Sequence, residues 1–560
     1  MDGIRHAMRL YIYIITQTLQ YCPGLESHHT MLSQLSDQSK IVKFYQSHYE
    51  NLNLLLIISL GLLYIALYIL QISKRRKNSP PGPFLKIPFL GHLESLLAGS
   101  DLVQKSRNFR KKYGDIFSYD VIGINTVHLC SYDLISKALK KREVSSRIPF
   151  HKFANINTVL SDIYIHGFHG LVVTEGQEWL EQRRFCFKTL KNFGFGKSSL
   201  ETIMQEEIKN FCSELKKHCQ DGPVDLGNRF NVMVINILWR IIGGKRFDYQ
   251  DKKFAKLVEH LNEGFSAIAP TPKLALLFAF PFLRKVFPRQ TGFEEIRRGY
   301  HGVYEFLQEE IQSHLENLDE DNPADFIDAY LLEMKRKKDN GETNSSFSAE
   351  KGFEILFCVL HDLFLAGSET SSTFLLWAII FLVRHPEVQT ELQAELDREV
   401  GRERLASMSD QESTPLTRAF IDEVHRAASH VPLGVQHWTS QQVELEGFVI
   451  PANSIIIPNI SEVHHEVGTW GEDSHQFRPG RLLDGLGRYQ RRREIIPYST
   501  GVRRCPGEAL AKSEIYLAIT ALLQHFHFST PAGAVSPGLE YKFGFTLTPK
   551  HFLVNINARL

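Results

Sequence analysis

An uncharged segment near the N-terminus constrains the architecture of this 560-residue chain more than any other feature. Residues 51–73 (NLNLLLIISLGLLYIALYILQIS) contain no charged side chain and are apolar on every helical face. A helix of this length spans a hydrocarbon core of about 30 Å. A buried core helix is the alternative, but the segment ends abruptly in the basic residues 74–77 (KRRK). This pattern predicts a single-pass transmembrane helix with the C-terminal part of the chain in the cytosol.

The residues around this helix predict the remaining divisions of the chain. Residues 1–50 form an N-terminal extension to which the sequence assigns no role. Residues 74–83 combine the basic stop-transfer cluster with three prolines, which end the helix and form a stiff hinge. Residues 84–560 contain no internal repeat, low-complexity segment or clear linker, so we expect one large domain there.

The pattern of this domain predicts a mainly α-helical fold with a small β portion. The apolar run 274–283 (LALLFAFPFL) is too short to span a membrane, and we assign it to the core rather than to one leaflet. We expect helices at 199–218, 291–316, 350–384 and 386–400, strands within 116–130 and 442–458, and loops at 218–223, 317–324 and 336–348.

Composition excludes several classes of function. The formal net charge of +1 gives no overall attraction to nucleic acid, and we expect no nucleic-acid partner. The seven cysteines include no CxxC pair, which argues against a zinc site and against a disulfide framework. A reducing compartment is the simplest interpretation, so Cys505 needs a separate explanation.

Cys505 lies in a loop sequence suited to presenting a thiolate. In residues 495–511 (IIPYSTGVRRCPGEALA), Gly501 and the pair Pro506-Gly507 permit a tight turn before an apolar, helix-prone run. A single cysteine suits haem better than zinc or an iron–sulfur cluster, which need several thiolates. Arg503 is placed to pair with a haem propionate. A buried, inert cysteine is the alternative, against which the surrounding glycines and arginines argue.

Three further motifs are weak individually. In residues 361–373 (HDLFLAGSETSST), Ala366 and Gly367 leave room beside a helix, and an acid and a hydroxyl follow; a helix with a tolerated glycine and a hydroxyl bonded to its own backbone is the alternative. In DEVHR, an acid and an arginine three residues apart share a helical face, as surface pairs often do. In EWLEQRRF, Trp179 and Arg183 could hold a carboxylate, or be a core indole and a surface cation.

Taken together, these motifs resemble those of the cytochrome P450 family over roughly residues 80–560. Residues 498–507 are similar to its haem loop F-x-x-G-x-R-x-C-x-G, although Tyr498 replaces the usual phenylalanine. Glu423, Arg426 and Arg481 match the family's E-x-x-R pair and its third member, with Gly480 in place of a usual glutamate. Segments such as 325–334 (DFIDAYLLEM) and 455–466 (IIIPNISEVHHE) resemble the animal family-2 clan, whose members are microsomal.

The resemblance implies a haem-thiolate mono-oxygenase that inserts one atom of O₂ into an apolar steroid, lipid or xenobiotic. It implies haem b, electrons from an NADPH–cytochrome reductase, a contribution from cytochrome b5, membrane lipid as a partner and an endoplasmic reticulum location. Arg184, Lys188 and Lys191 are candidates for the reductase-docking face, and a solvated helix face explains them almost as well. The implied site residues are Cys505 as iron ligand, Glu369 and Thr370 as a proton relay, and Arg503, Trp179, Arg183, His437, Gly507, Ala366 and Gly367 around the cofactor, with Arg147 a further candidate.

Two other functions compete with this prediction. One is a haem-thiolate isomerase or dehydratase that uses neither O₂ nor a reductase, and the other is a non-catalytic, membrane-anchored haem or sterol carrier. The intact pair Glu369-Thr370 favours the mono-oxygenase, because neither alternative needs a proton relay.

Overall fold

The computed structural model describes residues 54–67, 78–83, 86–87, 91–92, 101–193, 198–219, 222–267 and 272–559. The chain divides into two compact units, residues 1–76 and 77–560. In the first unit, Leu54–Leu67 form an apolar helix with every side chain exposed, Ile57 to 65%. This helix agrees with the central part of the predicted membrane segment, whose remaining residues lie outside the described part of the chain.

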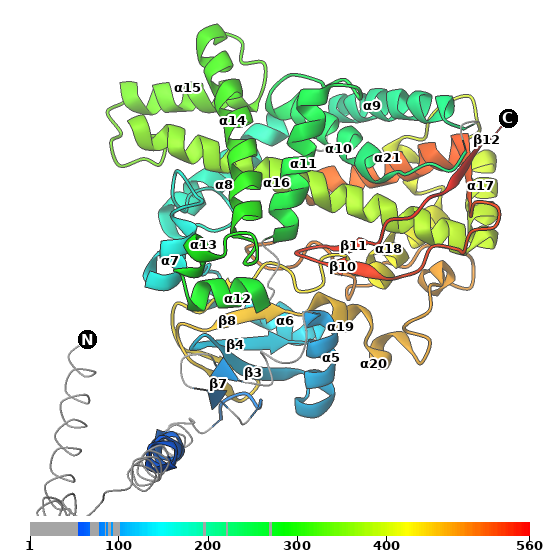
Figure 1. The fold of residues 1–560 in the computed structure, drawn as a ribbon. Coiled ribbons are helices and arrows are strands. Elements are labelled where there is room, and N and C mark those ends of the chain that lie inside the picture. Colours follow the sequence, from blue (N-terminus) through cyan, green and yellow to red (C-terminus); the bar gives the residue numbers. More distant parts are fainter. Residues whose placement is uncertain are drawn as a thin grey trace, which may run out of the picture. The chain divides into compact units, whose positions relative to one another are not determined.

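The second unit is mainly α-helical with a small β portion, as the sequence predicts (Figure 1). All four predicted helices are confirmed to within two residues at each end. One loop prediction is wrong at its start, because the helix that ends at Asp339 runs into the predicted loop 336–348. The longer helices are α5 (Leu102–Tyr113), α8 (Gly176–Asn192), α9 (Ser198–Lys217), α10 (Gly227–Ile242), α11 (Lys252–Ala267), α14 (Phe293–Asn317), α15 (Phe326–Asp339), α16 (Ala349–Arg384), α17 (Pro386–Glu399), α18 (Pro415–Ala428) and α21 (Glu508–His525).

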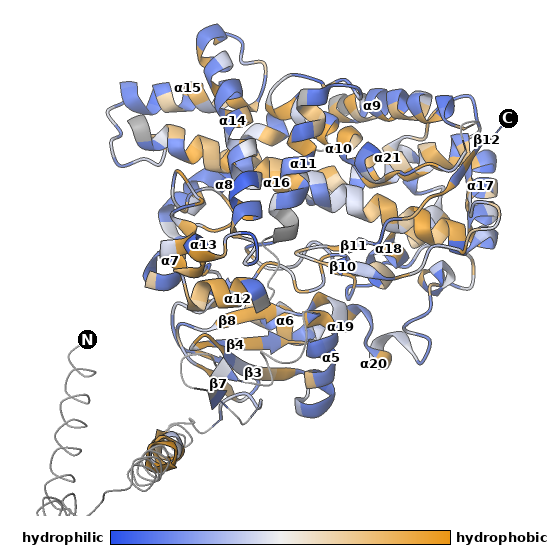
Figure 2. Ribbon diagram, in the orientation of Figure 1, coloured by the Kyte–Doolittle hydropathy of each residue, from blue (hydrophilic) through white to orange (hydrophobic). Residues whose placement is uncertain are grey.

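Helix α16 lies at the centre of the main core. Its residues 351–384 are apolar enough to cross a membrane, yet 72% of the most apolar stretch is buried inside the protein, which identifies it as a core helix. It packs against α10, α14, α18 and α21, and Figure 2 shows its apolar character along much of its length. Phe364 and Phe374 are fully buried in this core. The helix therefore has a fixed position from which its polar residues can act.

A six-stranded sheet forms the smaller, β-rich part of the domain, in the order β1-β2-β3-β4-β8-β5. Both predicted strand regions are confirmed within it and in a neighbouring hairpin. Strands β4 and β8 pair in parallel, with Thr126 opposite Ile455, whereas the other neighbours are antiparallel. The strands are β1 (Lys86–Ile87), β2 (Gly91–His92), β3 (Ile116–Val121), β4 (Ile124–Leu129), β5 (His437–Trp438) and β8 (Ile455–Pro458), with the hairpin β6 (Val443–Leu445) and β7 (Phe448–Ile450) beside them.

The assignment of residues 274–283 to the core is confirmed for part of the run, since Leu274 and Phe278 pack against the main core. Helix α12 (Pro272–Ala279) is short and largely apolar (Figure 2), whereas α13 (Leu283–Val286) has Arg284 and Lys285 between two apolar residues. Leu277 is fully buried, but Leu276, Phe280 and Phe282 are 49%, 43% and 60% exposed. A short apolar run has the same composition whether it faces the core or the outside, so composition could not separate the two.

Candidate cofactor site

The loop before α21 holds Cys505 at the end of a tight turn. The Cys505 N–H donates to the Tyr498 carbonyl over 3.0 Å, which closes the loop. Gly501 has a left-handed φ of 78°, and a Cβ there would lie 2.2 Å from the Leu139 carbonyl oxygen. Only glycine fits both the conformation and this close approach to the end of helix α6 (Tyr132–Leu139).

Cys505 lies directly before the N-terminus of α21, whose N-cap is Gly507. Burial raises the pKa of its thiol, whereas a hydrogen bond from the Gly507 N–H to the sulfur lowers that pKa. The N-terminal end of a helix also favours a negative charge. The sulfur is half-buried with a donor directed at it, as a thiolate ligand requires.

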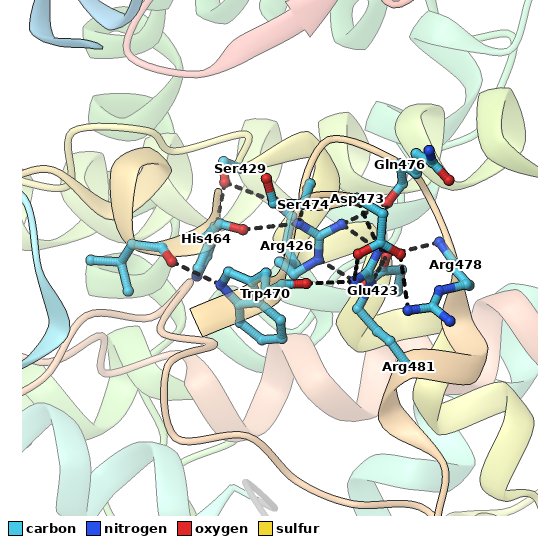
Figure 3. Close-up of polar contacts among 11 residues, drawn as sticks. Glu423, Arg426, Ser429, His464, Trp470, Asp473, Ser474, Gln476, Arg478 and Arg481 are labelled. Carbon is cyan, nitrogen blue, oxygen red and sulfur yellow. Dashed lines mark hydrogen bonds and ion pairs between the residues drawn. The ribbon is translucent and has the colours of Figure 1, made fainter. Parts of the chain in front are cut away.

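A buried ion-pair network supports the segment that leads to this loop (Figure 3). Glu423 and Arg426 are fully buried and form two hydrogen bonds of 2.8 Å, so the surface-pair alternative is wrong. Arg481 donates to the same carboxylate over 3.0 Å, as the resemblance implies. Arg426 also donates to carbonyls of residues 464, 474 and 476. The departure at Gly480 leaves this network intact, because a side chain there would meet open space.

Three arginines from different parts of the chain meet on one side of the Cys505 loop. Arg503 is buried and its guanidinium carbon lies 3.7 Å from the centre of the Trp179 ring. Arg183 stacks on the same ring at 5.4 Å, and Arg147 is buried nearby. Burial lowers the pKa of Arg503 to about 9, with a further lowering from Arg147 and Arg183. Burial and Arg183 lower the pKa of Arg147 to about 9 as well.

No anion is paired with this cluster in the described part of the chain, although Glu175 acts on Arg503 from beyond ion-pair distance. Among the residues that the structure describes, no carboxylate forms an ion pair with any of the three guanidinium groups, which donate only to backbone carbonyls. The Trp179 Nε1–H is buried without a hydrogen-bond partner. Since unpaired buried cations and donors are costly, the site fits a ligand with carboxylates of its own. The two propionates of haem have this chemistry, so these residues fit that cofactor.

His437 lies at the edge of this cluster, on β5. It is buried, and its Nδ1–H donates to the Val144 carbonyl over 2.8 Å. Burial first, and then the charge of Arg147, hold the pKa of this imidazole well below its usual value. Its other nitrogen, Nε2, can donate to a carboxylate only when the ring is protonated, which a neighbouring anion would favour.

On α16, the two small residues of the AGSET motif differ in their surroundings. Ala366 is exposed, whereas the residues around it on the helix are half-buried or buried, so it faces open space. A Cβ on Gly367 would lie 2.7 Å from Cδ2 of Leu238 on α10, so helix packing accounts for this glycine. A contact between Gly367 and a cofactor therefore stays a prediction.

The two polar residues of that motif have protein partners. The Thr370 hydroxyl donates to the Ala366 carbonyl over 2.8 Å, so it is bonded to the backbone of its own helix. One oxygen of Glu369 accepts hydrogen bonds from Thr373, Thr546 and Thr548 over 3.1–3.4 Å. Burial raises the pKa of this carboxyl. Glu369 can thus hold a proton closer to neutral pH than an exposed glutamate does.

The sequence did not reveal the role of Asp362, which positions the loop at residues 171–172 that Arg147 and Arg503 contact. Asp362 of α16 accepts hydrogen bonds from the N–H groups of Leu171 and Val172 over 2.6 and 2.9 Å. The carbonyl of Val172 in turn accepts from Arg147, and that of Leu171 from Arg503. Asp362 stood within the 361–373 motif, but no local signal links it to residues 190 positions earlier.

Comparison with known proteins places the chain among characterised relatives. A family model described as Cytochrome P450 matches residues 80–556. The chain is 33% identical to Cytochrome P450 2J3 of Rattus norvegicus, covering 89% of this chain and 95% of that protein. It is 35% identical to Cytochrome P450 2U1 of Homo sapiens, over 87% and 90%. It is 32% identical to Cytochrome P450 2L1 of Panulirus argus, over 83% and 91%.

Proposed function

Because this chain belongs to the cytochrome P450 family, we propose that Cys505 is its iron ligand and that Arg147, Trp179, Arg183, His437 and Arg503 hold the haem propionates. The protein is a haem-thiolate mono-oxygenase of animal family 2 that binds haem b and uses O₂. Its electrons come from NADPH through a redox-partner reductase, and its substrate is apolar. The relatives lend no support to an isomerase, a dehydratase or a non-catalytic carrier.

One observation supports the residue assignments best: the half-buried sulfur of Cys505 lies near half-buried Arg183 and two residues after buried Arg503, and neither arginine has an ion-pair partner among the described residues. When bound, haem supplies the reductive activation of O₂ and the insertion of one oxygen atom into the substrate. The protein's part is to keep Cys505 as a thiolate, which Gly507 and the N-terminal end of α21 favour. The arginines would neutralise two carboxylates that are otherwise costly to bury.

Proton delivery is assigned to Glu369 and Thr370 of α16. Burial raises the pKa of Glu369, and hydrogen bonds from three threonines fix its orientation. The Thr370 hydroxyl donates to the Ala366 carbonyl, so its oxygen is left to accept a hydrogen bond from a water molecule that would carry the proton. The exposed Ala366 marks the side of the helix on which this transfer takes place.

Consumption of NADPH tests the overall activity. We expect the purified full-length protein to oxidise NADPH when a microsomal cytochrome P450 reductase and an apolar substrate are both present, with one hydroxylated product formed. An isomerase would convert its substrate without NADPH, and a carrier would consume none. Product formation that is independent of the reductase would therefore contradict the assignment.

The protein is a microsomal membrane enzyme, and we assign its anchor to residues 51–73. The proposed arrangement has a single span, the stop-transfer and hinge segment 74–83 and a cytosolic haem domain at 84–560, with residues 1–50 as an extension without an assigned role. The exposed apolar helix Leu54–Leu67 and the basic residues 74–77 support it.

Protease treatment of sealed microsomes tests this topology. We expect digestion of the haem domain without detergent, because the basic cluster keeps it on the cytosolic side. Replacing residues 74–77 with glutamate is expected to weaken this orientation. Protection of the domain in sealed vesicles, with digestion only after detergent, would show the opposite orientation.

Membrane lipid is also proposed as a direct partner of the haem domain. Phe280, Phe282, Val286 and Phe287 around α12 and α13 are 43–60% exposed. Apolar side chains gathered on one surface segment favour insertion into the apolar edge of a bilayer. Exposed Lys285 in the same segment is suited to anionic head groups, whereas Arg284 is paired with Asp162.

The reductase-docking face is assigned to α8. Arg184, Lys188 and Lys191 are exposed on this helix, as are Leu180 and Phe187, which are 43% and 42% exposed. Arg183 of the same helix donates to the Arg504 carbonyl, beside Cys505, so the face lies close to the proposed iron ligand. A basic rim with apolar contacts suits an acidic electron donor, and cytochrome b5 is proposed as a second user of this face.

A further inference from the structure

A small cavity lies beside α16, between α11, α14 and residues 163–164. Its volume is about 30 Å³, enough for a water molecule or one small functional group. Most of its lining is apolar, and the polar exceptions are Tyr164, His260, Tyr300 and His361. Leu365 also lines it and directly precedes the exposed Ala366. The cavity therefore adjoins the part of α16 assigned to proton delivery.

The polar groups of this lining lack protein partners. Among the described residues, none forms a hydrogen bond with the hydroxyls of Tyr164 and Tyr300 or with the His361 ring. His260 Nδ1 is buried without a hydrogen-bond partner. Tyr300 is 6% exposed, and its ring centre lies 4.9 Å from that of Tyr164 and 4.8 Å from that of His361. Polar groups that line a cavity without protein partners normally bond to a ligand or to ordered water.

The electrostatics of the cavity limit what the ligand can be. Burial lowers the pKa of His361 to about 4 and raises that of Tyr164 to about 12, so both side chains are uncharged at neutral pH. No Lys or Arg occurs among the described lining residues. The acid Asp362 acts on Tyr164 and Tyr300, and Glu263, 3.9 Å from His260, is neutralised by Arg298. A carboxylate here would be buried without a cation and repelled by Asp362.

We propose that this cavity binds the oxygen-bearing end of an elongated apolar substrate, and that this end is an uncharged hydroxyl or carbonyl rather than a carboxylate. The inference rests on the mono-oxygenase function given above. Ala366 and Thr370 follow His361 on α16 by five and nine residues. At the rise of an α-helix, these separations correspond to distances of roughly 8 and 14 Å along the helix axis. Oxidation therefore occurs on carbons remote from the substrate's polar end.

Matched twelve-carbon probes test the proposal on the purified, full-length, haem-loaded protein. Equilibrium dialysis measures how n-dodecane, 2-dodecanone and dodecanoate displace tritiated 1-dodecanol, and it does not depend on turnover. We expect the alcohol and the ketone to bind about tenfold more tightly than the alkane and the carboxylate. Only the alcohol and the ketone can form hydrogen bonds with the polar groups of the cavity without adding a charge.

The variant Tyr300→Phe removes one hydroxyl and keeps the ring. We expect it to weaken 1-dodecanol binding about tenfold and to leave n-dodecane binding unchanged. The matched control is Tyr304→Phe, one turn further along α14, whose ring packs against Phe357 at 4.8 Å and does not line the cavity. It should leave the binding of both probes unchanged.

Equal binding of all four probes, or an unchanged alcohol affinity in Tyr300→Phe, would mean that the cavity holds water only and would overturn the proposal. Tighter binding of dodecanoate would overturn it too. A separate spectrum of the reduced carbon monoxide complex tests the haem-thiolate assignment. A missing thiolate signature refutes that assignment, whereas equal probe binding with a normal spectrum refutes this inference alone.

Discussion

Histidine in place of Cys505 is expected to abolish oxygenation and the strongly red-shifted absorption of the reduced carbon monoxide complex. Imidazole can still ligate haem iron, so the cofactor can be retained by the arginine cluster. It lacks the negative charge through which a thiolate favours O–O cleavage. The activity should therefore fall to the level of the assay background, while bound haem, measured after extraction as its pyridine complex, remains detectable.

The matched control for this variant is Cys219→His. Cys219 is also half-buried, but its thiol donates to the Leu215 carbonyl at the end of α9, outside the proposed site. The control should keep both the red-shifted absorption and the activity. If Cys505→His keeps the red-shifted absorption, another residue is the iron ligand and the assignment of the loop is wrong.

Alanine in place of Thr370 is expected to separate NADPH consumption from product formation. Alanine favours the helix, and the one lost bond is intrahelical, so the fold and the carbon monoxide spectrum should stay native. General acid catalysis of this kind contributes ~10²–10⁴-fold. With protons misdirected, we expect reduced oxygen to leave as hydrogen peroxide. The measurement is the ratio of hydroxylated product to NADPH oxidised, with peroxide release recorded in parallel.

Two further variants make this test specific. Thr390→Ala removes an exposed threonine of α17 that forms the same type of bond, to the Pro386 carbonyl over 2.9 Å, and should leave the ratio unchanged. Thr370→Ser keeps a hydroxyl and should retain most of the coupling. A parental ratio in Thr370→Ala would show that its hydroxyl is structural only, and that Glu369 or water delivers the proton alone.

Local sequence patterns predicted those parts of the protein whose cause is local. The long helices follow from apolar residues repeating over many turns, so their boundaries agree closely with the structure. The turn at Gly501 and the pair Glu423–Arg426 could also be predicted, because a tight loop and a helical spacing of three are properties of a short segment. The motifs around Cys505 and Glu423 could be predicted for the same reason, because each lies within a short segment of sequence.

Properties that depend on distant packing could not be predicted in this way. Asp362 positions residues 171–172 through hydrogen bonds that span about 190 positions. The stacking of Arg503 on Trp179 joins residues that are 324 positions apart in the chain. The Thr370 hydroxyl can form a hydrogen bond either within its own helix or with a group outside it, and the residue type alone does not determine which bond forms. The exposure of α12 and α13 depends on what covers them, and apolar composition does not reveal that.

The parallel pairing of β4 with β8 has a consequence for biosynthesis. Ile455 is made 329 residues after Thr126, its partner in the sheet. At ribosomal speeds of roughly 5–20 residues per second, the inner edge of β4 waits about 15–65 s for its neighbour. During that interval its unpaired N–H and C=O groups can pair with other chains. Chaperones that shield this edge during translation would prevent such pairing. Their supply would therefore limit the yield of the enzyme.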